Sequence, residues 1–131
     1  MSKLPKKLKL YFLEIDSKYA AMIYDGTKTM EFRTRRLPLN QIVCLVEDGV
    51  CTGYMMLAWE FRATAETVWN FAERRTVPFA GGGRAGITRK WLLDYAGDKI
   101  VGCYGIALSN RSCKPFRVNP SAPYPEESSH A

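Results

Sequence analysis

Residues 8–15 form a mostly hydrophobic, strand-like run broken by Lys9 and Glu14, which predicts a strand near the start of the chain. A short helix is expected next over 17–25, because Asp16 and Ser17 form a helix start and Tyr19, Met22 and Ile23 share one helical face. Gly26 follows directly, as a glycine just past a helix end should.

After Gly26 the spacing of hydrophobic residues becomes that of a strand. If residues 28–33 form a strand, successive side chains point to opposite faces, so Met30 and Phe32 enter a core while Glu31 and Arg33 share the other face. Lys28 is then expected at the point where the helix gives way to the strand.

Two apolar segments, 41–47 and 50–62, flank Asp48 and Gly49, a strong signal for a two-residue hairpin. Counting outward from this turn pairs Val46 with Cys51 and Cys44 with Gly53, so the two cysteines are expected on one face, diagonal to each other. Both strands carry apolar residues on both faces, which suits a closed barrel wrapped by helices. The pattern predicts one continuous side made of Ile42, Cys44, Val46, Cys51, Gly53, Met55, Leu57 and Trp59.

Two further helices are predicted over 65–73, with Thr64 as N-cap, and over 88–96, ended by Gly97. A strand over 100–108 follows. We therefore expect an α+β fold: a mostly antiparallel barrel of five or six strands with two or three short flanking helices, forming a single domain over 1–118. Residues 119–131 are rich in Pro, Ser and Glu and are expected to form a disordered tail.

The amino-acid composition favours one class of binding partner. The chain has 131 residues, of which 47% are hydrophobic, so it can bury a core without disulfides or metal. Lys and Arg number 19 against 13 Asp and Glu, a net charge of +6. This excess favours a polyanionic partner, although a soluble basic surface has the same composition.

Several features of the sequence argue against particular function classes. No segment resembles a membrane span or a secretory signal, which points to the cytoplasm, or to the nucleus of a eukaryote, where the four cysteines are expected to stay as thiols. No Cys-x-x-Cys or paired His/Cys spacing occurs, so no metal or other cofactor is expected. The single histidine, His130, lies in the predicted tail, which argues against Ser-His-Asp and Cys-His catalysis.

The segment around Glu31 is the best candidate for chemistry. A carboxylate beside a guanidinium offers an acceptor and a fork of donors to a base edge or a phosphate. A solvated strand face with a surface ion pair would read the same way. The glycine-rich segment 80–86 is expected to be a surface loop that either folds over a bound anion with Arg84 or simply connects two helices.

Residues 15–33 together resemble the ASCH domain family, a branch of the PUA-like β-barrels. The Gly-x-Lys-x-x-Glu-x-Arg motif of that family matches Gly26, Lys28, Glu31 and Arg33 without a gap. A weaker match follows the order Gly-Ile-Thr, helix, Tyr, Gly and closing strand over 86–108. The resemblance covers most of residues 7–108.

This resemblance implies a binding module, because PUA-like barrels commonly bind RNA or modified nucleobases. The cleft would lie between the first helix and the barrel. Lys28 and Glu31 would meet the nucleotide there, and Glu31 would accept a hydrogen bond from an exocyclic amine of cytosine or guanine. Arg33, Arg35 and Arg36 would hold phosphate, with Arg84 as a further candidate.

The alternative is a small hydrolase acting on nucleosides or RNA. Some ASCH-like proteins are acetylcytidine amidohydrolases that use a Lys, a Thr three residues later and a distant Glu, and others have been proposed to cut RNA. This chain keeps the lysine as Lys28 but has Glu31 in place of that threonine, and Thr29 cannot be assumed to replace it. Lys28 and Glu31 would be the catalytic pair if the protein is an enzyme.

Overall fold

A computed structural model describes residues 10–75 and 85–118. These residues form an α+β fold with a five-stranded mixed sheet and three helices, so the expected fold class is confirmed. In chain order the elements are β1 (Tyr11–Glu14), α1 (Ser17–Asp25), β2 (Met30–Arg33), β3 (Ile42–Glu47), β4 (Val50–Thr64), α2 (Ala65–Arg75), α3 (Arg89–Ala96) and β5 (Ile100–Arg117).

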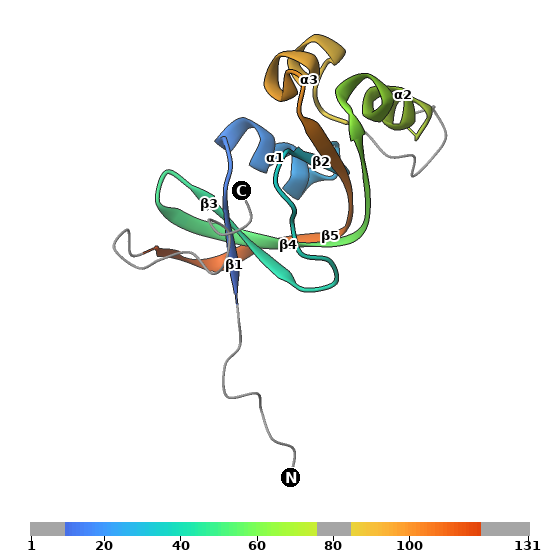
Figure 1. Cartoon of the computed structure of the whole chain (residues 1–131). Coiled ribbons are helices and arrows are strands. Elements are labelled where there is room, and N and C mark those ends of the chain that lie inside the picture. The colour runs from blue at the N-terminus through green and yellow to red at the C-terminus, as the bar shows by residue number, and fades with distance from the viewer. Residues whose placement is uncertain (1–9, 76–84, 119–131) are drawn as a thin grey trace.

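The strands lie in the order β1-β3-β4-β5-β2. Three neighbouring pairs are antiparallel, and β1 runs parallel to β3. Within the described residues β1 and β2 remain the two edges, so the sheet curls without closing into the continuous barrel expected from the sequence. Figure 1 shows β4 and β5 side by side along the molecule, curving together towards α2 and α3.

The hairpin at Asp48 and Gly49 is confirmed, with φ values of 50° and 81° that suit a tight two-residue turn. Val46 pairs with Cys51 as predicted, but Cys44 lies opposite Tyr54 and not opposite Gly53. The register shifts between Leu45 and Val46, because these consecutive residues of β3 lie opposite Gly53 and Cys51, which are two residues apart on β4. Such an irregularity changes which side chains of β4 face the core.

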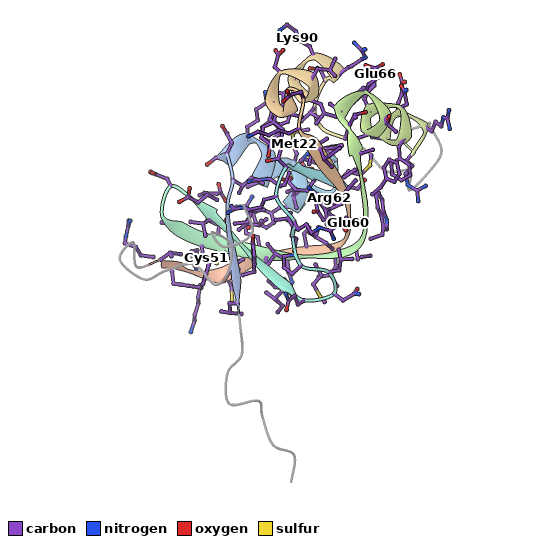
Figure 2. All side chains as sticks on the ribbon, viewed as in Figure 1. Met22, Cys51, Glu60, Arg62, Glu66 and Lys90 are labelled. Atoms are coloured by element: carbon purple, nitrogen blue, oxygen red, sulfur yellow. The ribbon has the colours of Figure 1, made fainter. Side chains whose placement is uncertain are left out.

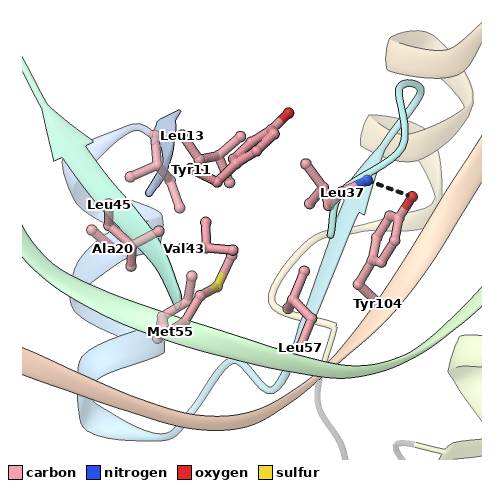
Figure 3. Packing of buried hydrophobic residues seen from close by; sticks show 11 residues of the cluster. Tyr11, Leu13, Ala20, Leu37, Val43, Leu45, Met55, Leu57 and Tyr104 are labelled. Carbon is pink, nitrogen blue, oxygen red and sulfur yellow. Dashed lines mark hydrogen bonds between the residues drawn. The ribbon is translucent and has the colours of Figure 1, made fainter. Parts of the chain in front are cut away.

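The side chains of β4 change faces at this shift, so the prediction of one continuous apolar side is wrong. Cys44, Val46 and Cys51 pack with Val118, whereas Met55 and Leu57, which follow the shift along β4, face the other way. There Met55 and Leu57 join the larger core of Tyr11, Leu13, Ile15, Ala20, Ile23, Leu37, Val43, Leu45 and Tyr104, most of which Figure 3 labels.

The helices begin and end close to their predicted residues. Asp16 accepts a hydrogen bond from the Lys18 amide at 3.0 Å, and Gly26 closes α1 with a φ of 87°. Thr88 accepts from the Trp91 amide at 3.0 Å at the start of α3. The strand β5 continues well past residue 108, because its second half pairs with the beginning of β4.

A second core lies under α2 and α3 and contains Met30, Phe32, Leu92 and Cys103. Met30 and Phe32 thus enter a core as predicted, which fixes the opposite orientation for Glu31. No helix in 10–75 or 85–118 is long and apolar enough to cross a membrane. The predicted tail, 119–131, lies outside the described residues.

Candidate functional site

A cavity of about 300 Å³ opens where α1, β2 and α3 meet the end of β1. This volume lies at the lower end of the range for small-molecule sites, about 300–1,000 Å³. Its walls are made by Glu14, Ile15, Asp16, Tyr19, Lys28, Glu31, Phe32, Arg33, Ile87, Trp91 and Tyr95. The structure therefore brings Lys28, Glu31 and Arg33 together at one cavity.

Glu31 is buried, with only 4% of the residue exposed. Arg33 Nε donates to Glu31 Oε2 at 2.7 Å, and Arg33 Nη2 donates to the Glu14 carbonyl at 3.1 Å. Glu31 Oε1 is buried and accepts no hydrogen bond from any described residue. Since buried carboxylate oxygens normally have a donor, Oε1 is an acceptor available to a ligand.

Lys28 lies in the connection between α1 and β2 and is only 3% exposed. Its Nζ donates to the Ala85 carbonyl at 2.7 Å and lies 3.8 Å from Glu31 Oε1. The ammonium also lies 5.5 Å from the centre of the Tyr19 ring and 5.3 Å from that of Phe32, within cation-π range.

Burial lowers the pKa of Lys28, because the protonated amine loses its hydration. The Glu31 carboxylate acts in the opposite direction, and the Arg33 guanidinium lowers the pKa further. A lysine in this setting can donate a hydrogen bond or, when neutral, accept a proton.

Aromatic rings line the remaining wall. Trp91 and Tyr95 stack with ring centres 5.0 Å apart, and Tyr19 meets Trp91 edge-on at 6.1 Å. Both α3 rings are more than one-third exposed, so their faces are available for contact. A flat aromatic ligand could stack in such a cavity while its edge reaches the Glu31 carboxylate.

The sequence analysis did not predict that Trp91 and Tyr95 line the site. Both lie within the helix predicted over 88–96. Their spacing of i and i+4 places them on the same helical face, which was the available signal. That this face meets Tyr19 from α1 depends on how α3 packs, and no local pattern reveals that packing.

A second, more open depression of about 700 Å³ continues from the cavity, and Arg33 and Tyr95 line both. We call it the basic groove; its lining residues are Arg33, Thr34, Arg35, Arg36, Arg62, Tyr95, Lys99 and Ile100. The candidates Arg35 and Arg36 thus lie beside the cavity and not in it. Arg62 and Lys99 were not anticipated. Arg84 lies outside the described residues.

Within 10–75 and 85–118, no group of three or more His, Cys, Asp or Glu side chains could hold a metal ion. The charged residues that line the cavity are three carboxylates, one amine and one guanidinium, beside four aromatic residues.

Comparison with solved structures identifies the architecture. The crystal structure of ASCH from Zymomonas mobilis superposes with a TM-score of 0.69 over 91% of this chain and 85% of its own. The chain has the ASCH-domain fold. A crystal structure of a mutant of the same Zymomonas mobilis protein gives a TM-score of 0.66, covering 84% of this chain and 76% of that one.

The expected ASCH fold is therefore confirmed at the level of architecture. The sequence identity is 18% for the first structure and 20% for the second, so the likeness describes the fold alone. No protein-family model matches this ASCH-fold chain, and no curated protein sequence is significantly similar to it. Its function has to be argued from its own site.

Proposed function

We propose that this ASCH-fold protein is a nucleic-acid or nucleotide binding module that recognises RNA or a modified nucleobase in the cavity beside α1. The observation that carries the proposal is the buried Oε1 of Glu31, which accepts no hydrogen bond from a described residue, in a cavity lined by aromatic rings. An unsatisfied buried acceptor costs free energy unless a ligand supplies the missing donor.

The polar groups match one edge of a nucleobase. Glu31 Oε1 accepts and Lys28 Nζ donates, and the two atoms lie 3.8 Å apart. Cytosine and guanine present the complementary combination, an exocyclic amine near a ring nitrogen or carbonyl acceptor. Tyr19, Trp91 and Tyr95 supply the stacking surfaces on which unpaired RNA bases are commonly held.

Binding of nucleosides tests the proposal directly. Cytidine, guanosine, uridine, adenosine and acetylcytidine would be titrated into the protein while the Trp91 indole resonance is followed by NMR. We expect a saturable shift with at least one nucleoside, and Glu31→Gln should weaken it about tenfold, because hydrogen bonds to a charged partner contribute about 1.5–3 kcal/mol.

Glu66→Gln is the matched control. It removes the same charge from α2, where Glu66 pairs with Arg89 and does not line the cavity. Figure 2 labels Glu66 on α2, away from the labelled Glu60 and Arg62. If no nucleoside shifts the Trp91 signal, or if both glutamine variants weaken binding equally, base recognition by Glu31 is refuted.

A second candidate function, hydrolysis of nucleosides or RNA, is favoured by one observation: burial lowers the pKa of Lys28 beside a carboxylate. A neutral Lys28 amine could take a proton from water as it adds to the amide carbonyl of acetylcytidine. The C–N bond would then break, releasing acetate, while the same proton passes to the amine of cytidine.

The described residues that line the cavity include no serine or threonine, and Thr29 is not among them. A turnover assay distinguishes the binding module from the hydrolase. If the protein only recognises its ligand, neither acetate nor cleaved RNA forms. Repeated turnover by the wild type that Lys28→Ala abolishes and Lys90→Ala retains would establish the hydrolase instead; Lys90 is an exposed residue of α3 paired with Asp94.

A further inference from the structure

The basic groove differs from the cavity in the state of its charges. Three of its arginines are already held by acceptors of the protein. Arg33 pairs with Glu31, Arg36 Nη1 lies 3.2 Å from Glu60 Oε1, and Arg62 Nη2 donates to the Thr34 carbonyl at 2.6 Å.

The other two cations of the groove have no such partner. The side chains of Arg35 and Lys99 form no ion pair or hydrogen bond with any residue in 10–75 or 85–118. Arg35 is nonetheless partly buried. A guanidinium that pairs with no described residue keeps its donors available to an anion.

The backbone that carries Arg35 is fixed by tertiary contacts. The Tyr95 hydroxyl accepts from the Thr34 amide at 3.0 Å, and the Tyr104 hydroxyl accepts from the Leu37 amide at 3.1 Å. Figure 3 shows the second bond. Arg62 adds its bond to the Thr34 carbonyl, and Figure 2 shows Arg62 next to Glu60 on β4.

Because Tyr95 lines both the cavity and the groove, the bond from Tyr95 to Thr34 joins the two sites through one ring. The groove is also more than twice the volume of the cavity, with more polar lining. A ligand whose base occupies the cavity therefore has room to continue past Tyr95 towards Arg35 and Lys99.

We propose that the basic groove is a backbone-phosphate subsite in which Arg35 and Lys99 contact phosphodiesters, so that the ligand is a single-stranded oligonucleotide and not a free nucleoside. This inference rests on the proposed base recognition in the cavity. It assigns phosphate contact to Arg35 and Lys99 and excludes Arg36, whose guanidinium already pairs with Glu60.

The experiment compares four probes: cytidine, cytidine 5′-monophosphate, a tetracytidylate RNA and the matching DNA. Affinity would be measured as a function of salt for the wild type and for Arg35→Gln, Lys99→Gln and Arg36→Gln. All three variants remove one positive charge from the same groove, so Arg36→Gln controls for general electrostatics.

We expect the tetranucleotides to bind at least tenfold more tightly than cytidine at low salt. Arg35→Gln and Lys99→Gln should each weaken tetranucleotide binding about fivefold and flatten the slope of log affinity against log salt by about 0.7, the value for one phosphate contact on a single strand. Cytidine binding should be unchanged in both variants, and Arg36→Gln should alter tetranucleotide affinity less than twofold. Similar behaviour of RNA and DNA supports a contact to phosphate.

Three results would overturn the inference while leaving base recognition intact. The first is cytidine binding that the tetranucleotide does not improve. The second is a gain already complete with cytidine monophosphate, which makes the ligand a mononucleotide. The third is an equal loss in Arg36→Gln. Failure of every probe to bind the wild type, by contrast, would remove the proposed function itself and this inference with it.

Discussion

Gly86 lies directly against the side chain of Lys28, so that a Cβ added at Gly86 would come within 2.8 Å of Lys28 Cγ. The backbone at Gly86 has a φ of +72°, a conformation that residues with a Cβ rarely adopt. Its neighbour Ala85 supplies the carbonyl that accepts from Lys28 Nζ. The segment leading into α3 thus holds the buried lysine from two sides.

Gly86→Ala should therefore displace Lys28 and weaken nucleoside binding. Gly97→Ala is the matched control, because Gly97 also has a positive φ, of +60°, but nothing lies within 4 Å of its added Cβ. Both substitutions should cost roughly 1–2 kcal/mol of stability through backbone strain. Only Gly86→Ala should change the ligand affinity in an NMR titration. Equal affinities would show that the position of Lys28 does not matter for binding.

Lys28 should also make the stability of the protein depend on pH. Its pKa in the folded state is lowered by burial from 10.5, so between the lowered value and about pH 10.5 the unfolded chain binds more protons at this site. The contribution of Lys28 to stability then rises with pH across that window. The difference in the free energy of unfolding between the wild type and Lys28→Met, measured with urea, should show this rise.

Lys90→Met is the control for the pH experiment. Hydrogen bonding to Asp94 raises the pKa of Lys90, so subtracting this variant cannot produce a rise with pH. A difference between wild type and Lys28→Met that is flat, or falls with pH up to 10.5, would contradict a lowered pKa for Lys28.

The four cysteines should separate by reactivity. Cys44, Cys51 and Cys103 are buried and Cys113 is exposed, all as free thiols. Burial raises the pKa of Cys44 and of Cys103 to about 12, which leaves almost no reactive thiolate near neutral pH. A thiol assay with a disulfide reagent should count one fast thiol in the native protein and four after denaturation. Cys113→Ser should remove the fast reaction.

Tyr104 should contribute strongly to the stability of the fold. Its hydroxyl donates to Glu60 Oε2 at 2.8 Å and accepts from the Leu37 amide and from Arg62 Nη1. Burial, together with the bond to Glu60, raises the pKa of Tyr104 to about 12. Tyr104→Phe removes all three bonds, although Glu60 keeps Arg36 and Arg62 keeps the Thr34 carbonyl, and should cost about 1–3 kcal/mol in urea unfolding.

Tyr95→Phe is the matched control for Tyr104→Phe. It also removes a hydroxyl that accepts a backbone amide, from Thr34, but Tyr95 is 39% exposed and water can replace it. We expect a loss below about 1 kcal/mol for Tyr95→Phe, typical of an exposed hydrogen bond. A cost for Tyr104→Phe no larger than this would mean that the Tyr104 network does not hold the Arg35 segment.

The sequence by itself determined the parts of this protein that follow from local chemistry. Asp16, Thr88 and Gly26 mark helix ends because caps satisfy backbone groups within a few residues. Asp48 and Gly49 make the hairpin, and the alternation around Glu31 sends Met30 into the core and the carboxylate away from it. The motif from Gly26 to Arg33 was therefore enough to single out Lys28, Glu31 and Arg33.

Only the tertiary structure decided what surrounds that motif. The register shift between β3 and β4 at Leu45 and Val46, which divides the predicted apolar side of the hairpin, has no local sequence signal of its own. Trp91 and Tyr95 reach Tyr19 because α3 packs beside α1, and Lys99 joins Arg35 because Tyr95 ties the two segments together. The pairing of Arg36 with Glu60 likewise joins positions far apart in the chain. Such contacts depend on the packing of whole elements, so local patterns name the candidate residues without showing which charges are already neutralised.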